Sequence, residues 1–290
     1  PAENYAYYSW YVDYTDDIYV GYRYYETAYA DMEKEAAGSG DEWYAENVVY
    51  PFGYGLSYTD FEWAVESAKV YAGDEAAELS GARINNKSAS IEVKVAVTNT
   101  GDVAGKEVVQ LYYSVPYTAG GIEKSAIDLA DFAKTALLEP GQTETLTLSF
   151  DLYDMASYEC YDKNGNGIAT YELEAGDYNI SLRNDVHTLN PCDGSVINFS
   201  LPDPLSYKLD PETKRIVKNR FTGESAYGGV PIDGSTAGVP ITYVSRSDFA
   251  GTFPAQRTEN RSGNNVEKAN SYIFDGYEGA EAPTQGVEGD

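Results

Sequence analysis

Oxygen-bearing side chains in two places of this sequence could do chemistry. In the first, they alternate along the chain as in the first half of a calcium-binding loop, at Asp162, Asn164 and Asn166. Gly167 follows at the sixth position, but Leu173 stands where the calcium-binding Glu should be. Glu172 and Glu174 flank it, and in a strand we expect both to point elsewhere. The Asn-Gly pairs favour a hairpin tip, with a calcium site as the alternative.

The second place is Asp248, which lies in the run Ser-Arg-Ser-Asp-Phe. No histidine or cysteine pattern supports other chemistry. His187 is the only histidine, and its polar neighbours predict an ordinary surface residue. With no CxxC pair, a zinc site of the usual kind is excluded, and we expect no cofactor. Cys160 and Cys192 are the only cysteines, and the sequence leaves their pairing open.

Charge narrows the classes of partner. The 20 basic and 47 acidic residues give a net charge of −27. Such a charge repels phosphate groups and anionic lipids, so we expect neither nucleic acid nor membrane as a partner. No apolar run is long enough to cross a membrane. These features predict a soluble protein, with an extracellular location slightly favoured over a cytoplasmic one.

Residues 17–59 are predicted to form a strand, a helix and a loop in turn. Residues 17–25 are rich in Tyr and predict a short strand that enters a turn. Residues 28–37 are good helix formers, and the Gly-Ser-Gly run at 38–40 predicts the end of that helix. Residues 50–59 combine glycines, a proline and aromatic residues, which predicts a tight, packed loop.

Residues 60–201 predict β-structure throughout. Apolar residues at every second position, the period of a half-buried strand, mark residues 91–97 and 146–150. Residues 107–113 predict the next strand, and residues 171–182 predict a hairpin about the Glu-Ala-Gly-Asp turn. Short strands separated by frequent turns are typical of a β-sandwich of immunoglobulin or fibronectin type.

The resulting fold class is mainly β. We expect a fibronectin-III/immunoglobulin-like β-sandwich over residues 63–203. A short α/β remnant should precede it over residues 1–62, and an extended connector should follow over residues 204–290, where Gly, Pro, Ser and Asn are frequent and no hydrophobic period persists.

Several long motifs resemble family-3 glycoside hydrolases of the β-glucosidase type. They are IYVGYRYYET (18–27), YPFGYGLSYTDF (50–61), VTNTGDVAGKEVVQLYYSVP (97–116), LLEPGQTETLTLSFDLYDMASYE (137–159) and YELEAGDYNISL (171–182). In the family these motifs run from the end of the α/β lobe through the fibronectin-III-like domain. The runs VPITYVSRSDFAGTFP (239–254) and GAEAPTQGV (279–287) resemble a permuted subgroup in which the TIM barrel comes last.

The resemblance implies a fragment without its own catalytic pair. A retaining glycosidase needs two carboxylates about 5–5.5 Å apart. In the family the nucleophile is an Asp of the barrel and the acid/base is a Glu of the α/β lobe, and neither region is expected here. Asp248 superficially resembles the family's Ser-Asp-Trp nucleophile context. Its flanking residues fit the connector, so we favour a turn or capping role.

Three functions remain open. The first is the structural region that braces the catalytic domains of a β-glucosidase-like enzyme, inactive by itself. Its partners would be the TIM barrel and the α/β lobe, in the same or a second chain, with a β-glucoside or oligosaccharide as a possible ligand. The second is a non-catalytic carbohydrate-binding module, with Trp10, Trp43 and Trp63 as candidate sugar-stacking residues. The third is an extracellular scaffold or assembly protein.

Overall fold

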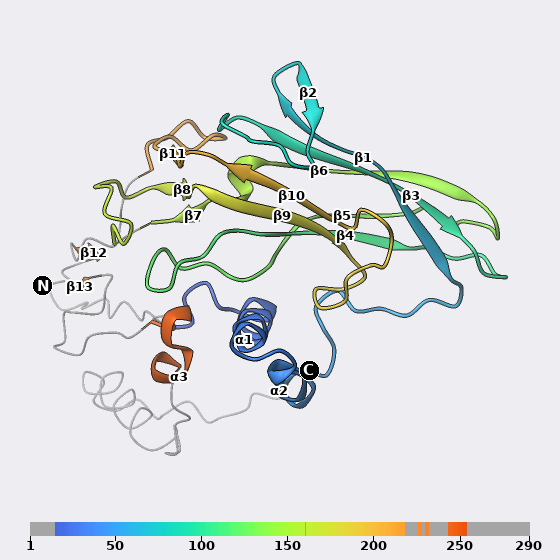
Figure 1. The fold of residues 1–290 in the computed structure, drawn as a ribbon, viewed down its shortest axis with the longest axis horizontal. Helices are drawn as coiled ribbons and strands as arrows, with labels where there is room; N and C mark the ends of the chain where they lie inside the picture. The colour runs from blue at the N-terminus through green and yellow to red at the C-terminus, as the bar shows by residue number, and fades with distance from the viewer. Residues whose placement is uncertain (1–14, 160, 218–224, 228–229, 232–242, 254–290) are drawn as a thin grey trace, which may run out of the picture. The chain divides into compact units, whose positions relative to one another are not determined.

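Two four-stranded antiparallel sheets dominate the computed structural model, which describes residues 15–159, 161–217, 225–227, 230–231 and 243–253 (Figure 1). The first sheet has the order β2 (Glu75–Glu78), β1 (Phe61–Ala72), β3 (Ser90–Asn99), β6 (Thr143–Asp151). The second has the order β10 (Val196–Leu201), β9 (Gly176–Arg183), β4 (Val108–Ser114), β5 (Asp128–Lys134). The mainly β sandwich predicted from the sequence is confirmed.

Strand β3 shows how the sequence pattern builds the sandwich. Its buried residues alternate with partly exposed ones along its whole length. It pairs with β1 on one side and β6 on the other, and the register sets Val93 opposite Leu148 and Val95 opposite Leu146. Because side chains alternate between the faces of a strand, this pairing directs both sets of apolar residues into the same core.

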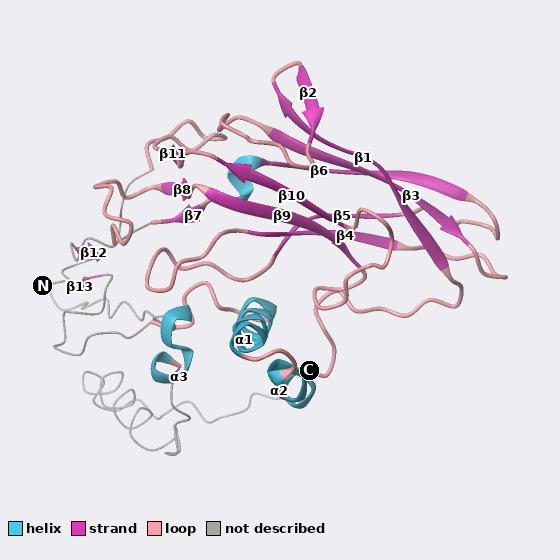
Figure 2. Ribbon diagram, in the orientation of Figure 1, coloured by secondary structure: helices cyan, strands magenta, loops and turns pink. Residues whose placement is uncertain are grey.

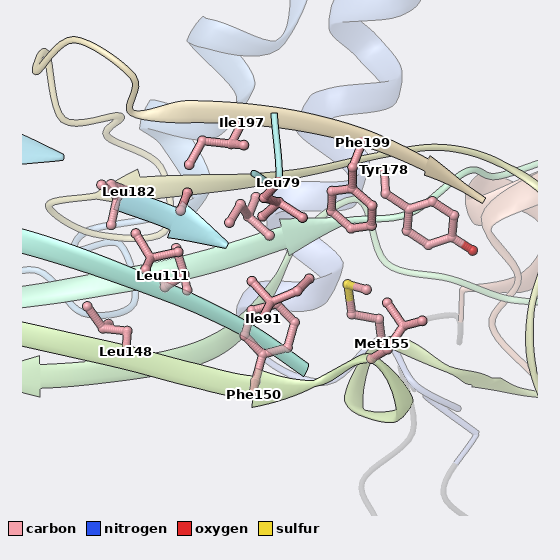
Figure 3. Packing of buried hydrophobic residues seen from close by; sticks show 14 of the residues in the cluster. Leu79, Ile91, Leu111, Leu148, Phe150, Met155, Tyr178, Leu182, Ile197 and Phe199 are labelled. Atoms are coloured by element: carbon pink, nitrogen blue, oxygen red, sulfur yellow. The ribbon is translucent and has the colours of Figure 1, made fainter. Parts of the chain in front are cut away.

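The core lies between the two sheets. Figure 3 shows side chains from both of them meeting there, among them Ile91 and Leu148 from the first sheet and Leu111 and Leu182 from the second. All four are fully buried. Trp63 of β1 also belongs to this cluster and is only 4% exposed. It therefore cannot stack on a sugar at the surface, contrary to its role as a sugar-stacking candidate.

Shorter strands extend the sandwich at one end. A three-stranded sheet has the order β11 (Leu205–Tyr207), β8 (Tyr171–Leu173), β7 (Ser157–Tyr158). The predicted hairpin over residues 171–182 is wrong, because β8 and β9 belong to different sheets and do not pair. A backbone φ of 148° at Gly176 lies where the chain passes from one sheet to the other. The short strands β12 (Ser225–Tyr227) and β13 (Val230–Pro231) pair with each other.

Two helices stand where the sequence predicted a strand and one helix (Figure 2). Helix α1 (Tyr22–Glu35) begins inside the predicted strand at 17–25, and α2 (Ser39–Asn47) begins inside the run that should end a helix. Gly38 has the left-handed φ of 81° that allows the sharp turn between them. Glu33 accepts hydrogen bonds from the backbone N–H groups of Gly38 and Gly40, both at 2.8 Å, which satisfies free donors at the start of α2.

The remaining helical elements of the described residues are short. They are η1 (Leu152–Met155), η3 (Arg246–Asp248) and α3 (Phe249–Thr252). In the described part of the chain, no helix combines the length and the apolar character needed to cross a membrane.

Candidate functional site

Glu123 ties three distant parts of the chain together. Its carboxylate accepts hydrogen bonds from the Tyr19 hydroxyl (2.7 Å), the Ser245 hydroxyl (2.6 Å) and the Arg246 backbone N–H (3.1 Å). Lys163 adds an ion pair at 3.1 Å. Burial by itself raises the pKa of Glu123, but these hydrogen bonds outweigh burial and hold the pKa below its usual value. One carboxylate of the sandwich therefore binds both the N-terminal segment and residues 245–246.

Arg246 makes the second connection at this place. Its guanidinium donates two hydrogen bonds to the Asp31 carboxylate of α1, at 2.7 and 2.8 Å. A third bond reaches the Lys124 carbonyl oxygen at 3.1 Å, and the Tyr117 ring centroid lies 4.2 Å from the guanidinium carbon. With Arg246 only 7% exposed, this bidentate pair fixes the segment against the helix.

A buried cluster joins the two helices to the sandwich. Glu26 of α1 accepts a hydrogen bond from the Tyr44 hydroxyl of α2, and its other carboxylate oxygen lies 3.1 Å from Nδ1 of His187. The His187 ring stacks on the Tyr44 ring, with centroids 3.9 Å apart and planes 16° apart. Burial, followed by the bond to Glu26, raises the pKa of Tyr44. The prediction that His187 is an ordinary surface residue holds only in part: 27% of its side chain is exposed, but its ring packs against Tyr44 and Tyr29 of the two helices.

A cleft of about 1170 Å³ lies along the loop that joins α2 to β1. Gln110 of β4 holds this loop through a hydrogen bond to the Gly53 carbonyl oxygen at 3.1 Å. Apolar side chains of the loop project outward, with Leu56 88% exposed. Glu107 lines the same cleft, where burial raises its pKa to about 7. The cleft thus combines an apolar rim with several carboxyl groups, among which Glu107 has a raised pKa.

Asp248 serves as a helix cap in the structure. It precedes α3, and its carboxylate accepts a hydrogen bond from the Gly251 backbone N–H at 2.9 Å. Phe249, the next residue, packs edge-on against Tyr19 at a centroid distance of 4.9 Å. The predicted turn or capping role of Asp248 therefore agrees with this geometry.

The loop that holds the calcium candidates folds back onto β8. Asn164 and Asn166 both donate side-chain hydrogen bonds to Glu172, with shortest distances of 2.8 Å. The expectation that Glu172 points elsewhere is therefore wrong. In the described part of the chain, no three His, Cys, Asp or Glu side chains are grouped as metal ligands. Cys192 is a free thiol, whereas Cys160 and Trp10 lie outside the described residues.

Two of these residue pairs could not be predicted from the sequence, because their members lie far apart along the chain. Asp31 and Arg246 are 215 positions apart, and Glu26 and His187 are 161 apart. No local spacing predicts such pairs. The one available signal was the quoted run at 239–254, which contains both Ser245 and Arg246.

Known proteins contain regions that are similar to the sandwich of this chain. Residues 107–186 match the family described as fibronectin type III-like domain. β-Glucosidase A of Butyrivibrio fibrisolvens is 43% identical over 176 residues, which cover 61% of this chain and 19% of that protein. A β-glucosidase of Ruminococcus albus is 34% identical over 208 residues, which cover 71% of this chain and 18% of that protein.

A solved structure of another β-glucosidase is also similar to this chain. The crystal structure of a β-glucosidase from Paenibacillus barengoltzii superposes with a TM-score of 0.52 at 38% identity, covering 68% of this chain and 18% of the other. The chain spans about a fifth of the length of the curated relatives that it matches. In those relatives, the matched region is one part of a longer polypeptide.

Proposed function

We propose that this chain, which carries the fibronectin type III-like domain found in its β-glucosidase relatives, braces the catalytic domains of a retaining, family-3 β-glucosidase-like enzyme. A TIM barrel and an α/β lobe, in the same polypeptide or a second chain, would supply the nucleophile and the acid/base. The whole enzyme would cleave terminal β-linked sugars. The 290 residues alone would be inactive.

One observation carries this proposal: the sandwich anchors the segments on both sides of it in the sequence. Tyr19 and Arg246 both bind Glu123, and Arg246 also binds Asp31 of α1. A sandwich that fixes its two flanking segments at one place can set the relative positions of domains attached to them. Enzymes need such positioning because small displacements of catalytic groups are costly in rate.

Hydrolysis of an aryl β-glucoside by the purified chain tests the catalytic part of the proposal. We expect no turnover. Turnover that disappears in Asp248→Asn would overturn it, because this chain would then supply a nucleophile of its own. Fluorescence titration with β-linked oligosaccharides tests the carbohydrate-binding alternative, which saturable binding would support.

The bracing part is tested by Arg246→Gln, with exposed Arg215→Gln as the matched control. The variant removes charge-assisted hydrogen bonds to Asp31. We expect chymotrypsin to cut after Phe249 about tenfold faster or more in this variant, because the segment detaches more often. Equal cleavage rates in both variants would show that the segment is not held by this pair.

We also infer that the protein is soluble, and we propose an extracellular location for it. A charge of −27 favours solubility by keeping the chains apart. Fractionation of the producing cells tests this inference, and recovery of the protein with the cytoplasmic fraction alone would contradict it.

A further inference from the structure

The loop between β7 and β8 closes over a buried carboxylate. Glu172 of β8 is 1% exposed. It receives one hydrogen bond from the side-chain amide of Asn164 (2.8 Å) and two from that of Asn166 (2.8 and 3.0 Å). The loop thus brings Glu172 to the two asparagines of the calcium-like run, although it stands one position before the usual twelfth ligand.

The backbone of the loop is folded around its own side-chain oxygens. Asp162 accepts the N–H of Gly167 at 2.8 Å. Asn164 accepts the N–H of Asn166 at 3.2 Å, and Asn166 accepts the N–H of Ile168 at 2.7 Å. A positive φ of 74° at Gly167 permits the sharp bend. These bonds hold a carboxylate and two amide groups on one short turn.

A second, independent observation is Glu159, the residue just after β7. It is 1% exposed, and its Oε2 atom has no hydrogen-bond partner in the described part of the structure. The backbone N–H of Glu159 bonds to Thr170, which continues the β7–β8 ladder. By alternation, Glu159 and Glu172 lie on the same face of this ladder, the face that the loop covers. An unpaired carboxylate oxygen therefore sits buried beside the loop.

No ion pair balances the two glutamates of this face, and Lys124 acts on Glu159 only through a longer-range attraction. Lys124 forms an ion pair with Glu174, and Lys163 forms one with Glu123. Among the described residues, neither Glu159 nor Glu172 has a cationic partner within 4.0 Å. Buried carboxylates are normally paired or bound to a metal ion. A bound cation would supply the missing positive charge.

We propose that the loop is a calcium site with side-chain ligands from Asp162, Asn164, Asn166 and Glu172, and the carbonyl oxygen of Ile168 as a fifth ligand. The donors are all oxygens, and two are neutral amides, which suits a hard, flexible cation such as Ca²⁺ better than Zn²⁺. Each amide oxygen keeps its bond from a backbone N–H and offers its second lone pair to the ion, and the bonds from the amide nitrogens to Glu172 are given up. Glu159 lies beside the site as a further negative charge.

Calorimetric titration of the chelator-washed, full 290-residue chain with CaCl₂ tests the site. We expect one ion per chain with a Kd of ~10⁻⁴–10⁻³ M, the range of sites with few charged ligands. Asp162→Asn and Glu172→Gln should each weaken binding by about tenfold or more. MgCl₂ should bind much more weakly, because Mg²⁺ demands a small octahedral set of ligands.

The matched control is Asp74→Asn, which changes an exposed Asp in another turn and should bind calcium like the wild type. Far-UV circular dichroism establishes that each chain is folded. Since Asp162 is exposed, its variant keeps the test valid if Glu172→Gln does not fold. A folded chain that binds no calcium, binds Mg²⁺ equally well, or binds Ca²⁺ unchanged in Asp162→Asn would overturn the proposal.

Discussion

Single buried or half-buried carboxylates at the edges of the sandwich hold separate elements together. Glu26 has partners on α2 and on the loop after β9, and Glu123 has partners on both flanking segments. A hydrogen bond to a charged group contributes more than one between neutral groups. Loss of one partner therefore costs more than the bond alone, because a charge is left poorly solvated.

Replacing His187 should loosen the helices. His187→Ala removes the ring that stacks on Tyr44 and pairs with Glu26. We expect the free energy of unfolding to fall by ~1–3 kcal/mol, as for other buried polar partners left unpaired. Urea denaturation measures it, and Leu189→Ala, a partly exposed neighbour, is the control. Equal midpoints for the two variants would contradict this role for the ring.

Glu107 should make stability depend on pH. Burial raises its pKa from 4.5 to about 7, so the folded chain holds this proton more tightly than the unfolded chain. The resulting stability is fully present below pH 4.5 and is lost as the pH rises through 7. After allowance for solvent screening at a half-buried group, the loss is ~1–2 kcal/mol.

The variant Glu107→Gln lacks this titration. Urea unfolding at pH 5 and pH 8 compares it with the wild type. Between these values, the wild type should lose ~1–2 kcal/mol more of its free energy of unfolding than the variant. A parallel pH dependence in the two proteins would place the pKa of Glu107 near its ordinary value.

At the scale of elements, the loop between α2 and β1 depends on close backbone packing against the sandwich. Thr59 donates a hydrogen bond to Asn99 at 2.8 Å, and Gln110 holds Gly53. At Gly53, φ is 82°, a conformation that favours glycine. A Cβ atom there would also overlap the side-chain oxygen of Gln110. Bonds to β3 and β4 therefore position the loop in addition to its own hydrogen bonds, such as the one from the Tyr54 N–H to the Pro51 carbonyl oxygen.

Two alanine substitutions separate these effects. Gly53→Ala should destabilise the chain by ~1–3 kcal/mol, because it combines backbone strain with the overlap at Gln110. Gly55→Ala is the matched control, since a Cβ at Gly55 meets no atom within 4 Å and its φ is not positive. Thermal unfolding of both variants measures the difference, and a similar loss for both would argue against a fixed loop.

On the scale of the whole molecule, the two sheets share one core and should unfold together. Leu111 and Leu148 belong to different sheets, and neither is exposed to solvent. A side chain removed from either sheet leaves its cavity in the same cluster. We therefore expect the sandwich to behave as one cooperative unit.

Leu111→Ala and Leu148→Ala should each lower the free energy of unfolding by ~2–5 kcal/mol. Each variant should still show one transition by circular dichroism and by tyrosine fluorescence. The surface variant Val103→Ala, at a residue 47% exposed, should change stability by less than about 0.5 kcal/mol. Two separated transitions would mean that the sheets are independent.

Much of the sandwich follows from sequence alone. The alternation along residues 91–97 and 146–150 and the turns between strands predict buried strand faces, because a strand has a period of two whatever it packs on. The family motifs likewise place the fibronectin type III-like region, as the match over residues 107–186 bears out.

Only the tertiary structure decided the contacts that hold the flanking segments. Residues 17–25 have a pattern that fits a strand, yet burial of Glu26 and Thr27 against the sandwich accompanies a helix. The partners of Arg246 and His187 lie far away in the sequence. Local patterns encode the period of a strand or helix, whereas a pair between remote residues exists only once the core has brought their elements together.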